Sequence, residues 1–171
     1  SELSEAAQEL GCVLSLFALA PIPWSLVESA AVGQDTEKLE DARVELESLH
    51  LLQGEDTYQL HQLIREFFGT KQTALASADK QKDNFCQALL TVAQSIPNQP
   101  TLELIKSVKD AIPHLEEIAQ NISDTVKDEN LICFFWGLNR FYSKQGLYAK
   151  AETWLKQFVS SVQTRLGSDH P

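Results

Sequence analysis

Histidine and cysteine are the residue types in this sequence best suited to metal binding or nucleophilic catalysis. They are His50, His61, His114 and His170, with Cys12, Cys86 and Cys133. The histidines show neither H-x-x-x-H nor H-E-x-x-H spacing, the cysteines form no C-x-x-C pair, and no serine lies in G-x-S-x-G. An odd number of cysteines in apolar stretches favours reduced core thiols of a cytosolic protein. The spacing therefore predicts neither a metal centre nor a catalytic site.

His61 is the histidine for which the sequence predicts a binding role. It lies where a predicted strand at residues 57–60 gives way to a helix that contains Leu63 and Phe67. A neutral imidazole can donate one hydrogen bond and accept another, which suits a phosphate or a backbone carbonyl. The alternative is that His61 only caps the helix or packs at the surface.

The elements around His61 form a recognisable order in residues 1–75. If residues 10–19 form a helix, nearly every side of it is apolar, which predicts a helix buried on most sides. A short helix at 24–31 and an amphipathic helix at 36–50 follow. Residues 51–60 predict two short strands around a glycine turn, with a helix directly after them. Three helices and a two-stranded wing are a winged-helix arrangement.

Everything beyond residue 77 has helical periodicity. Helices are predicted at residues 85–96 and 102–118, and Pro113 must kink or split the second. After a polar connector, two final helices are predicted at residues 131–144 and 147–166. Stacked helical hairpins are the expected architecture.

The last forty residues resemble a tetratricopeptide repeat (TPR) of the kinesin-light-chain-like kind. The match runs through Leu138, Tyr142, Gly146, Tyr148 and Ala151, and closes with Leu166-Gly167-Ser168-Asp169-His170-Pro171. Asn139 stands where the family prefers Gly, and Phe158 where it prefers Ala, so the packing here must differ from the consensus. One repeat cannot bury its own face, so the resemblance implies further repeats after residue 171. The alternative is a generic helical hairpin.

Four residues of the helix at 131–144 point away from its predicted packed face: Trp136, Arg140, Ser143 and Lys144. The resemblance implies that they line the concave side of a repeat superhelix, where peptide ligands lie. An aromatic side chain beside Arg and Lys suits an acidic or aromatic partner segment. The alternative is that Trp136 packs against a neighbouring helix.

Residues 1–75 resemble the winged-helix subdomain that follows the ATPase core in NB-ARC (STAND-class) signalling proteins. The resemblance is carried by LFALAPIP at 16–23, LESLHLL at 46–52 and YQLHQLIREF at 58–67. In that family a histidine after the wing, in the MHD motif, touches bound ADP. His61 matches this histidine, while Leu60 replaces the Met and Gln62 the Asp.

The resemblance implies a nucleotide, but the sequence has no phosphate-binding loop of the G-x-G-x-x-G or G-x-x-x-x-G-K-[ST] type. ADP or ATP would therefore be held mainly by an upstream domain of a longer protein, and this chain needs no cofactor of its own. The absence of methionine, and an end directly after an amphipathic stretch, also favour a piece of a longer protein.

The charge pattern bears on whether the winged helix binds DNA. The chain has a formal net charge of −10; residues 1–75 hold 13 acids and 4 bases (net −9) and the remainder 11 acids and 10 bases (net −1). The predicted recognition helix carries five acids against Lys38 and Arg43, a net charge of −3. Binding in the major groove draws on Lys and Arg at the phosphates, so this sign disfavours DNA.

These patterns predict a mainly α chain: a winged-helix domain at residues 1–75, a helical hairpin or linker at 76–128, and a TPR at 129–171. The predicted function is a non-catalytic, cytoplasmic module of a bacterial NB-ARC protein that couples a nucleotide switch to a TPR sensor. Its partners would be a protein or peptide on the TPR surface and the NTPase domain of the same protein, and neither nucleic acid nor membrane. The alternatives are a DNA-binding regulator whose TPR receives a signal, and a passive scaffold.

Overall fold

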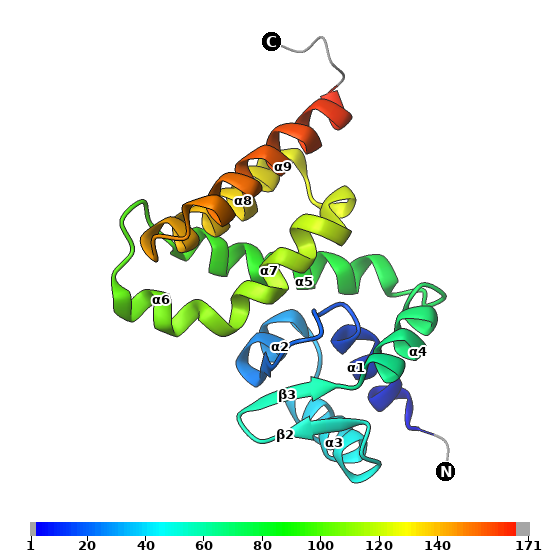
Figure 1. The fold of residues 1–171 in the computed structure, drawn as a ribbon. Coiled ribbons are helices and arrows are strands. Elements are labelled where there is room, and N and C mark those ends of the chain that lie inside the picture. Colours follow the sequence, from blue (N-terminus) through cyan, green and yellow to red (C-terminus); the bar gives the residue numbers. More distant parts are fainter. Residues whose placement is uncertain (1–2, 167–171) are drawn as a thin grey trace. The chain divides into compact units, whose positions relative to one another are not determined.

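The computed structural model describes residues 3–166, which are mainly helical and form one small three-stranded antiparallel sheet (Figure 1). The chain divides into two compact units, Ser1–Leu89 and Leu90–Pro171. Helix α5 (Ala78–Ser95) includes most of the helix predicted at 85–96 and contributes residues to both units. The predicted domain boundaries at residues 75 and 128 stay predictions.

The first helix differs in extent from the predicted one. Helix α1 (Glu5–Leu14) begins at Ser4, whose hydroxyl oxygen accepts a hydrogen bond from the Ala7 amide at 3.1 Å, and it ends before Ser15. The prediction of a helix as far as residue 19 was therefore wrong. The apolar run continues past the helix because Leu16 and Phe17 remain buried in a loop.

Helices α2 (Trp24–Ala30) and α3 (Thr36–Ser48) lie where the periodicity placed them. The Asp35 carboxylate accepts a hydrogen bond from the Glu37 amide at 3.0 Å and so caps α3. The face of α3 that contains Leu39 and Leu46 is buried.

The sheet has the strand order β1-β3-β2, with β1 (Ile22–Pro23), β2 (Leu52–Gly54) and β3 (Thr57–Leu60). The β2–β3 hairpin was predicted, whereas β1 was not, because two residues that include a proline carry no alternating pattern. Gly54 is required at the turn: a Cβ there would lie 1.9 Å from the Thr57 carbonyl oxygen.

Helix α4 (Gln62–Gln72) follows β3 directly and packs against α1. The two helices approach closely because Gly11 has no side chain; a Cβ there would lie 2.4 Å from the Phe68 ring. The Arg65 guanidinium ties α4 to the loop after α1 through a 2.7 Å hydrogen bond to the Phe17 carbonyl. The Phe17 ring in turn meets Phe85 edge-on at 4.7 Å.

In the unit Leu90–Pro171, the end of α5 is followed by helices α6 (Leu102–Val108) and α7 (Ile112–Glu117), which are separated by a 3₁₀ turn at Lys109–Ala111. Pro113 lies in the first turn of α7, so the predicted split of this helix is confirmed. A π-helical turn (Ile118–Ile122) and a 3₁₀ turn (Ser123–Thr125) lead to the next helix.

Helices α8 (Asp128–Lys144) and α9 (Tyr148–Leu166) run side by side as a hairpin (Figure 1). Gly146 at their junction has a φ of 74°, which favours glycine. The predicted packed face of α8 is buried, namely Leu131, Phe134, Phe135, Leu138 and Tyr142. Within residues 3–166, no helix combines the length and the apolarity needed to cross a bilayer.

Candidate functional site

A groove of about 660 Å³ runs along the small sheet in the unit Ser1–Leu89. Its lining comes from the loop after α1, through Leu19 and Pro21, and from the hairpin. Its polar lining includes His50 and His61 together with three glutamines. Among these lining residues of the described chain there is no Asp, Glu, Lys or Arg, although the unit is strongly acidic.

His61 lies at the point where β3 ends and α4 begins. Its Nδ1 accepts a hydrogen bond from the Leu63 amide at 3.3 Å, so the ring caps α4. In a neutral imidazole whose Nδ1 lone pair is engaged in this way, the proton is carried by Nε2. The second nitrogen of His61 is then a hydrogen-bond donor, which matches an oxygen of a phosphate, a carboxylate or a carbonyl. A metal ion would instead require a free lone pair.

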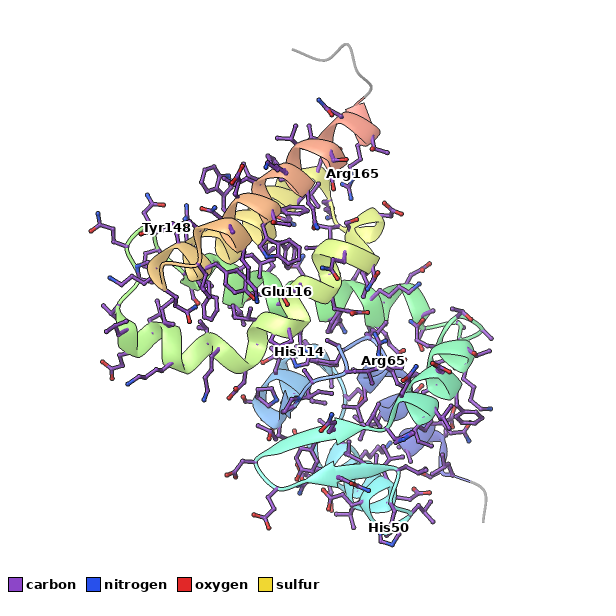
Figure 2. The ribbon with its side chains drawn as sticks, viewed as in Figure 1. His50, Arg65, His114, Glu116, Tyr148 and Arg165 are labelled. Atoms are coloured by element: carbon purple, nitrogen blue, oxygen red, sulfur yellow. The ribbon has the colours of Figure 1, made fainter. Side chains whose placement is uncertain are left out.

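His50 also lines the groove, although the sequence pattern predicted no binding role for it. It follows α3 and has a φ of 56°, in the left-handed region. The His50 amide donates a hydrogen bond to the Glu47 carbonyl, and the Leu51 amide donates one to the Leu46 carbonyl, each at 2.9 Å. This is a Schellman ending, in which glycine is the usual residue. Figure 2 shows His50 at this end of α3. A histidine directly after a helix and before a strand was the available sequence signal.

Arg43 on α3 is held by an internal network. Its guanidinium lies over the Trp24 ring at 5.2 Å and the Tyr58 ring at 5.6 Å, and it donates hydrogen bonds to the Tyr58 hydroxyl and to Glu40. Partial burial lowers the pKa of Arg43, but these hydrogen bonds raise it above its ordinary value, so the charge is permanent. Contacting an external phosphate would require this network to be broken.

The predicted peptide-binding residues of α8 are not equally accessible. Trp136 is 40% exposed and Lys144 is exposed, while Ser143 is half-buried. The Arg140 guanidinium donates a 3.0 Å hydrogen bond to the Ile96 carbonyl and lies 5.9 Å from the Trp136 ring. Arg140 therefore already secures the end of α5.

The residues of the TPR match lie in and around the α8–α9 turn. Leu138, Tyr142 and Ala151 are buried, whereas Tyr148 is 70% exposed at the start of α9 (Figure 2). The terminal part of the match, residues 167–171, lies outside the described residues. Asn139, one of the two departures from the family pattern, joins the helices through a 3.1 Å hydrogen bond from its side-chain amide to the Ala151 carbonyl.

The second departure, Phe158, packs against the Phe135 ring at a centroid distance of 5.5 Å. A large side chain at this position fills space between α8 and α9 that a smaller residue would leave. Both departures thus take part in the packing of this hairpin.

Three other ionisable side chains, those of Cys12, His114 and Tyr142, are buried in the core. Burial raises the pKa of the Cys12 thiol to about 11, which opposes thiolate chemistry. Burial, then the hydrogen bond to Glu116 at 2.6 Å, raises the pKa of Tyr142 above its usual range. His114 is fully buried on α7. Within residues 3–166, no group of three or more His, Cys, Asp or Glu residues could hold a metal ion.

Comparison with known proteins identifies no relative of this chain. No family model matches the sequence, no curated protein matches it, and no solved structure matches the fold.

Proposed function

We propose that this chain is a non-catalytic regulatory module of a cytoplasmic NB-ARC (STAND-class) signalling ATPase. In this proposal His61 touches a nucleotide held by an upstream domain, and the helical hairpins bind a protein partner. The observation that carries the proposal is that the two ring nitrogens of His61 have different roles. Nδ1 caps α4, which leaves Nε2–H as a donor in a groove whose lining residues include no carboxylate. Phosphate oxygens are the acceptors that such a donor suits.

The element order supports the winged-helix part of the proposal. Three helices, a hairpin and a further helix follow one another from α1 to α4, and His61 lies directly after the second strand of the hairpin. The α8–α9 hairpin, with its left-handed Gly146 and its buried Ala151, supports the TPR part.

The proposed protein partner would contact the exposed side of α8. Trp136 offers an aromatic surface and Lys144 an exposed positive charge, and Ser143 lies between them in the sequence. Arg140 would act chiefly by holding the Trp136 ring, because its own Nη1 is engaged by Ile96. An acidic or aromatic segment fits this combination.

Replacement of His61 in the full-length protein tests the nucleotide role. We expect His61→Ala to speed ADP release about tenfold, because a hydrogen bond to a charged phosphate is lost. The measurement is the dissociation rate of a fluorescent ADP analogue in a stopped-flow chase.

His61→Asn is the matched control, because asparagine is a good helix cap but lacks the imidazole donor. Fast release in both variants supports a nucleotide contact. If release is fast only in His61→Ala, the histidine is a cap and no more, and unchanged release in both variants would leave the passive scaffold as the better description.

The rival proposal, a DNA-binding regulator, would use α3 as its recognition helix. The engagement of Arg43 by Glu40, Tyr58 and Trp24 argues against it, because Lys38 is then the remaining base on a helix with five acids.

A further inference from the structure

The outer face of the small sheet carries side chains that the nucleotide role of His61 does not use. Along β3 the burial alternates: Tyr58 is 2% exposed and Leu60 4% exposed, whereas Gln59 is exposed to solvent. Gln53 of β2 pairs directly with Gln59 in the sheet and is exposed too. The two glutamines therefore lie side by side on the outer face, where both line the groove of about 660 Å³.

The side-chain amides of these two glutamines are available to an outside group. Neither makes a hydrogen bond within residues 3–166, whereas Gln62, the third glutamine of the groove lining, donates to Glu66 at 2.9 Å. Each amide has two N–H donors and a carbonyl acceptor. Residues directly opposite in an antiparallel pair have Cβ atoms about 5 Å apart, so one ligand group can reach both amides.

The spacing along β3 fits an extended polypeptide. Thr57 precedes Gln59 by two residues, so it lies on the same face of the strand, about 7 Å away, and it lines the same groove. The N–H and C=O groups on one edge of an extended chain also recur every two residues, at the same distance. An extended segment along β3 can therefore offer one residue's N–H and C=O groups to the glutamines and the next such pair to the Thr57 hydroxyl.

The rest of the lining indicates which side chains the segment carries. Pro21 precedes β1 and Leu51 precedes β2, so these apolar residues lie on opposite sides of β3, and both line the groove. Across the described residues that line the groove, none is charged. A charged side chain would therefore lose water here without gaining an ion-pair partner. The charge match is to a neutral segment, although the unit itself is acidic.

We propose that the outer face of this sheet binds an uncharged, extended segment of a partner protein. Its backbone N–H and C=O groups bond to the side chains of Gln53, Gln59 and Thr57. Its small apolar side chains pack against Pro21 and Leu51. Because β3 has four residues, the segment in contact with it has about four residues as well.

Titration of the ¹⁵N-labelled chain with a short peptide tests this proposal. The probe is N-acetyl-Ser-Val-Thr-Val-Ser-amide, which is uncharged and rich in β-branched residues that favour the extended conformation. We expect the side-chain amide resonances of Gln53 and Gln59 to shift saturably with one dissociation constant. The resonance of Gln34, exposed in the same unit but outside the groove lining, is expected to stay constant.

A second peptide, with lysine in place of the central threonine, tests the match in charge. We expect it to bind about tenfold more weakly, because the groove lining offers its ammonium group no counter-ion. Equal or tighter binding of the lysine peptide would show that the overall acidity of the unit governs binding, and it would overturn the proposal.

Gln59→Val keeps a residue that suits a strand but removes the amide, so we expect the affinity for the neutral peptide to fall about fivefold. Gln34→Val is the matched control and is expected to leave the affinity unchanged, and a thermal melt checks that each variant is folded. His61→Ala is also expected to leave it unchanged, so the fate of the nucleotide role does not decide this proposal.

Three results would overturn the proposal: no saturable shift with the neutral peptide, full affinity in Gln59→Val, or a shift of the Gln53 and Gln59 resonances by ADP and not by the peptide. The last of these would assign the outer face to the nucleotide instead.

Discussion

At the scale of single residues, a contact made by one atom of a side chain decides what its other atoms can still bind. His61 uses one nitrogen to cap α4, and this fixes the proton on the other. The Arg43 guanidinium contacts Tyr58, Glu40 and Trp24, so an outside group could bind it only if these contacts were given up. The role of Arg43 follows in part from Tyr58 and Trp24 on other elements, whereas that of His61 follows from an amide two residues further along its own helix.

Cys12 gives a residue-scale prediction for stability in alkali. Burial raises the pKa of its thiol from 9.0 in the unfolded chain to about 11 in the folded chain. Between these values the unfolded chain loses a proton that the folded chain keeps, so the unfolded state binds fewer protons and stability falls as the pH rises. Below pH 9 the stabilisation is fully present.

The expected loss is roughly 2 kcal/mol of unfolding free energy between pH 9 and pH 11. It is measured by urea denaturation at a series of pH values, as the difference between wild type and Cys12→Ala. A constant difference across this range would contradict the prediction, because other groups titrate alike in both proteins.

At the scale of elements, the helices of the unit Ser1–Leu89 are held together by close approach as well as by apolar area. The Phe68 ring of α4 lies against Gly11 of α1. The Phe17 ring, from the loop after α1, meets the Phe85 ring of α5 although the two residues are far apart in the sequence. A core packed to this density has no room for an added methyl group.

Two helical glycines allow a matched test of this packing. Gly11→Ala is expected to lower the unfolding free energy by about 1–3 kcal/mol, because the new Cβ would lie 2.4 Å from the Phe68 ring. Gly69→Ala on α4 meets nothing within 4 Å and is expected to raise it by about 0.5–1 kcal/mol through helix propensity alone. The measurement is the urea midpoint of each variant, and equal effects of the two changes would show that the α1–α4 contact is not tight.

At the scale of the whole molecule, net charge sets the class of partner that the chain attracts. A formal charge of −10, concentrated in residues 1–75, repels nucleic acid and favours basic or cationic partners. The proposed docking on an NTPase domain is compatible with this sign, which disfavours the rival DNA-binding function.

Duplex DNA should accordingly fail to bind this chain even at low salt, where electrostatic attraction is strongest. The measurement is the fluorescence anisotropy of a labelled duplex during titration with protein, which we expect to stay constant. A double variant, Glu37→Lys with Asp41→Lys, reverses two exposed charges on α3 and serves as the positive control, with a rise in anisotropy that salt removes. A salt-dependent rise with the wild-type chain would favour the DNA-binding regulator.

Much of the secondary structure was determined by local sequence. Helix α3 follows from its apolar spacing and the Asp35 cap, the break before α7 follows from Pro113, and the β2–β3 hairpin follows from a change of period around Gly54. These signals act within one or two turns of the chain, so a single sequence contains them.

The tertiary structure alone decided where α1 ends, that residues 22–23 join the sheet as β1, and that Arg43 is engaged by Tyr58. Each of these depends on residues far apart in the sequence, such as Pro23 beside Thr57 or Arg43 beside Tyr58. The physical reason is that periodicity and capping report on a residue's own helix or strand, whereas burial and hydrogen-bond satisfaction depend on what the rest of the chain brings next to it.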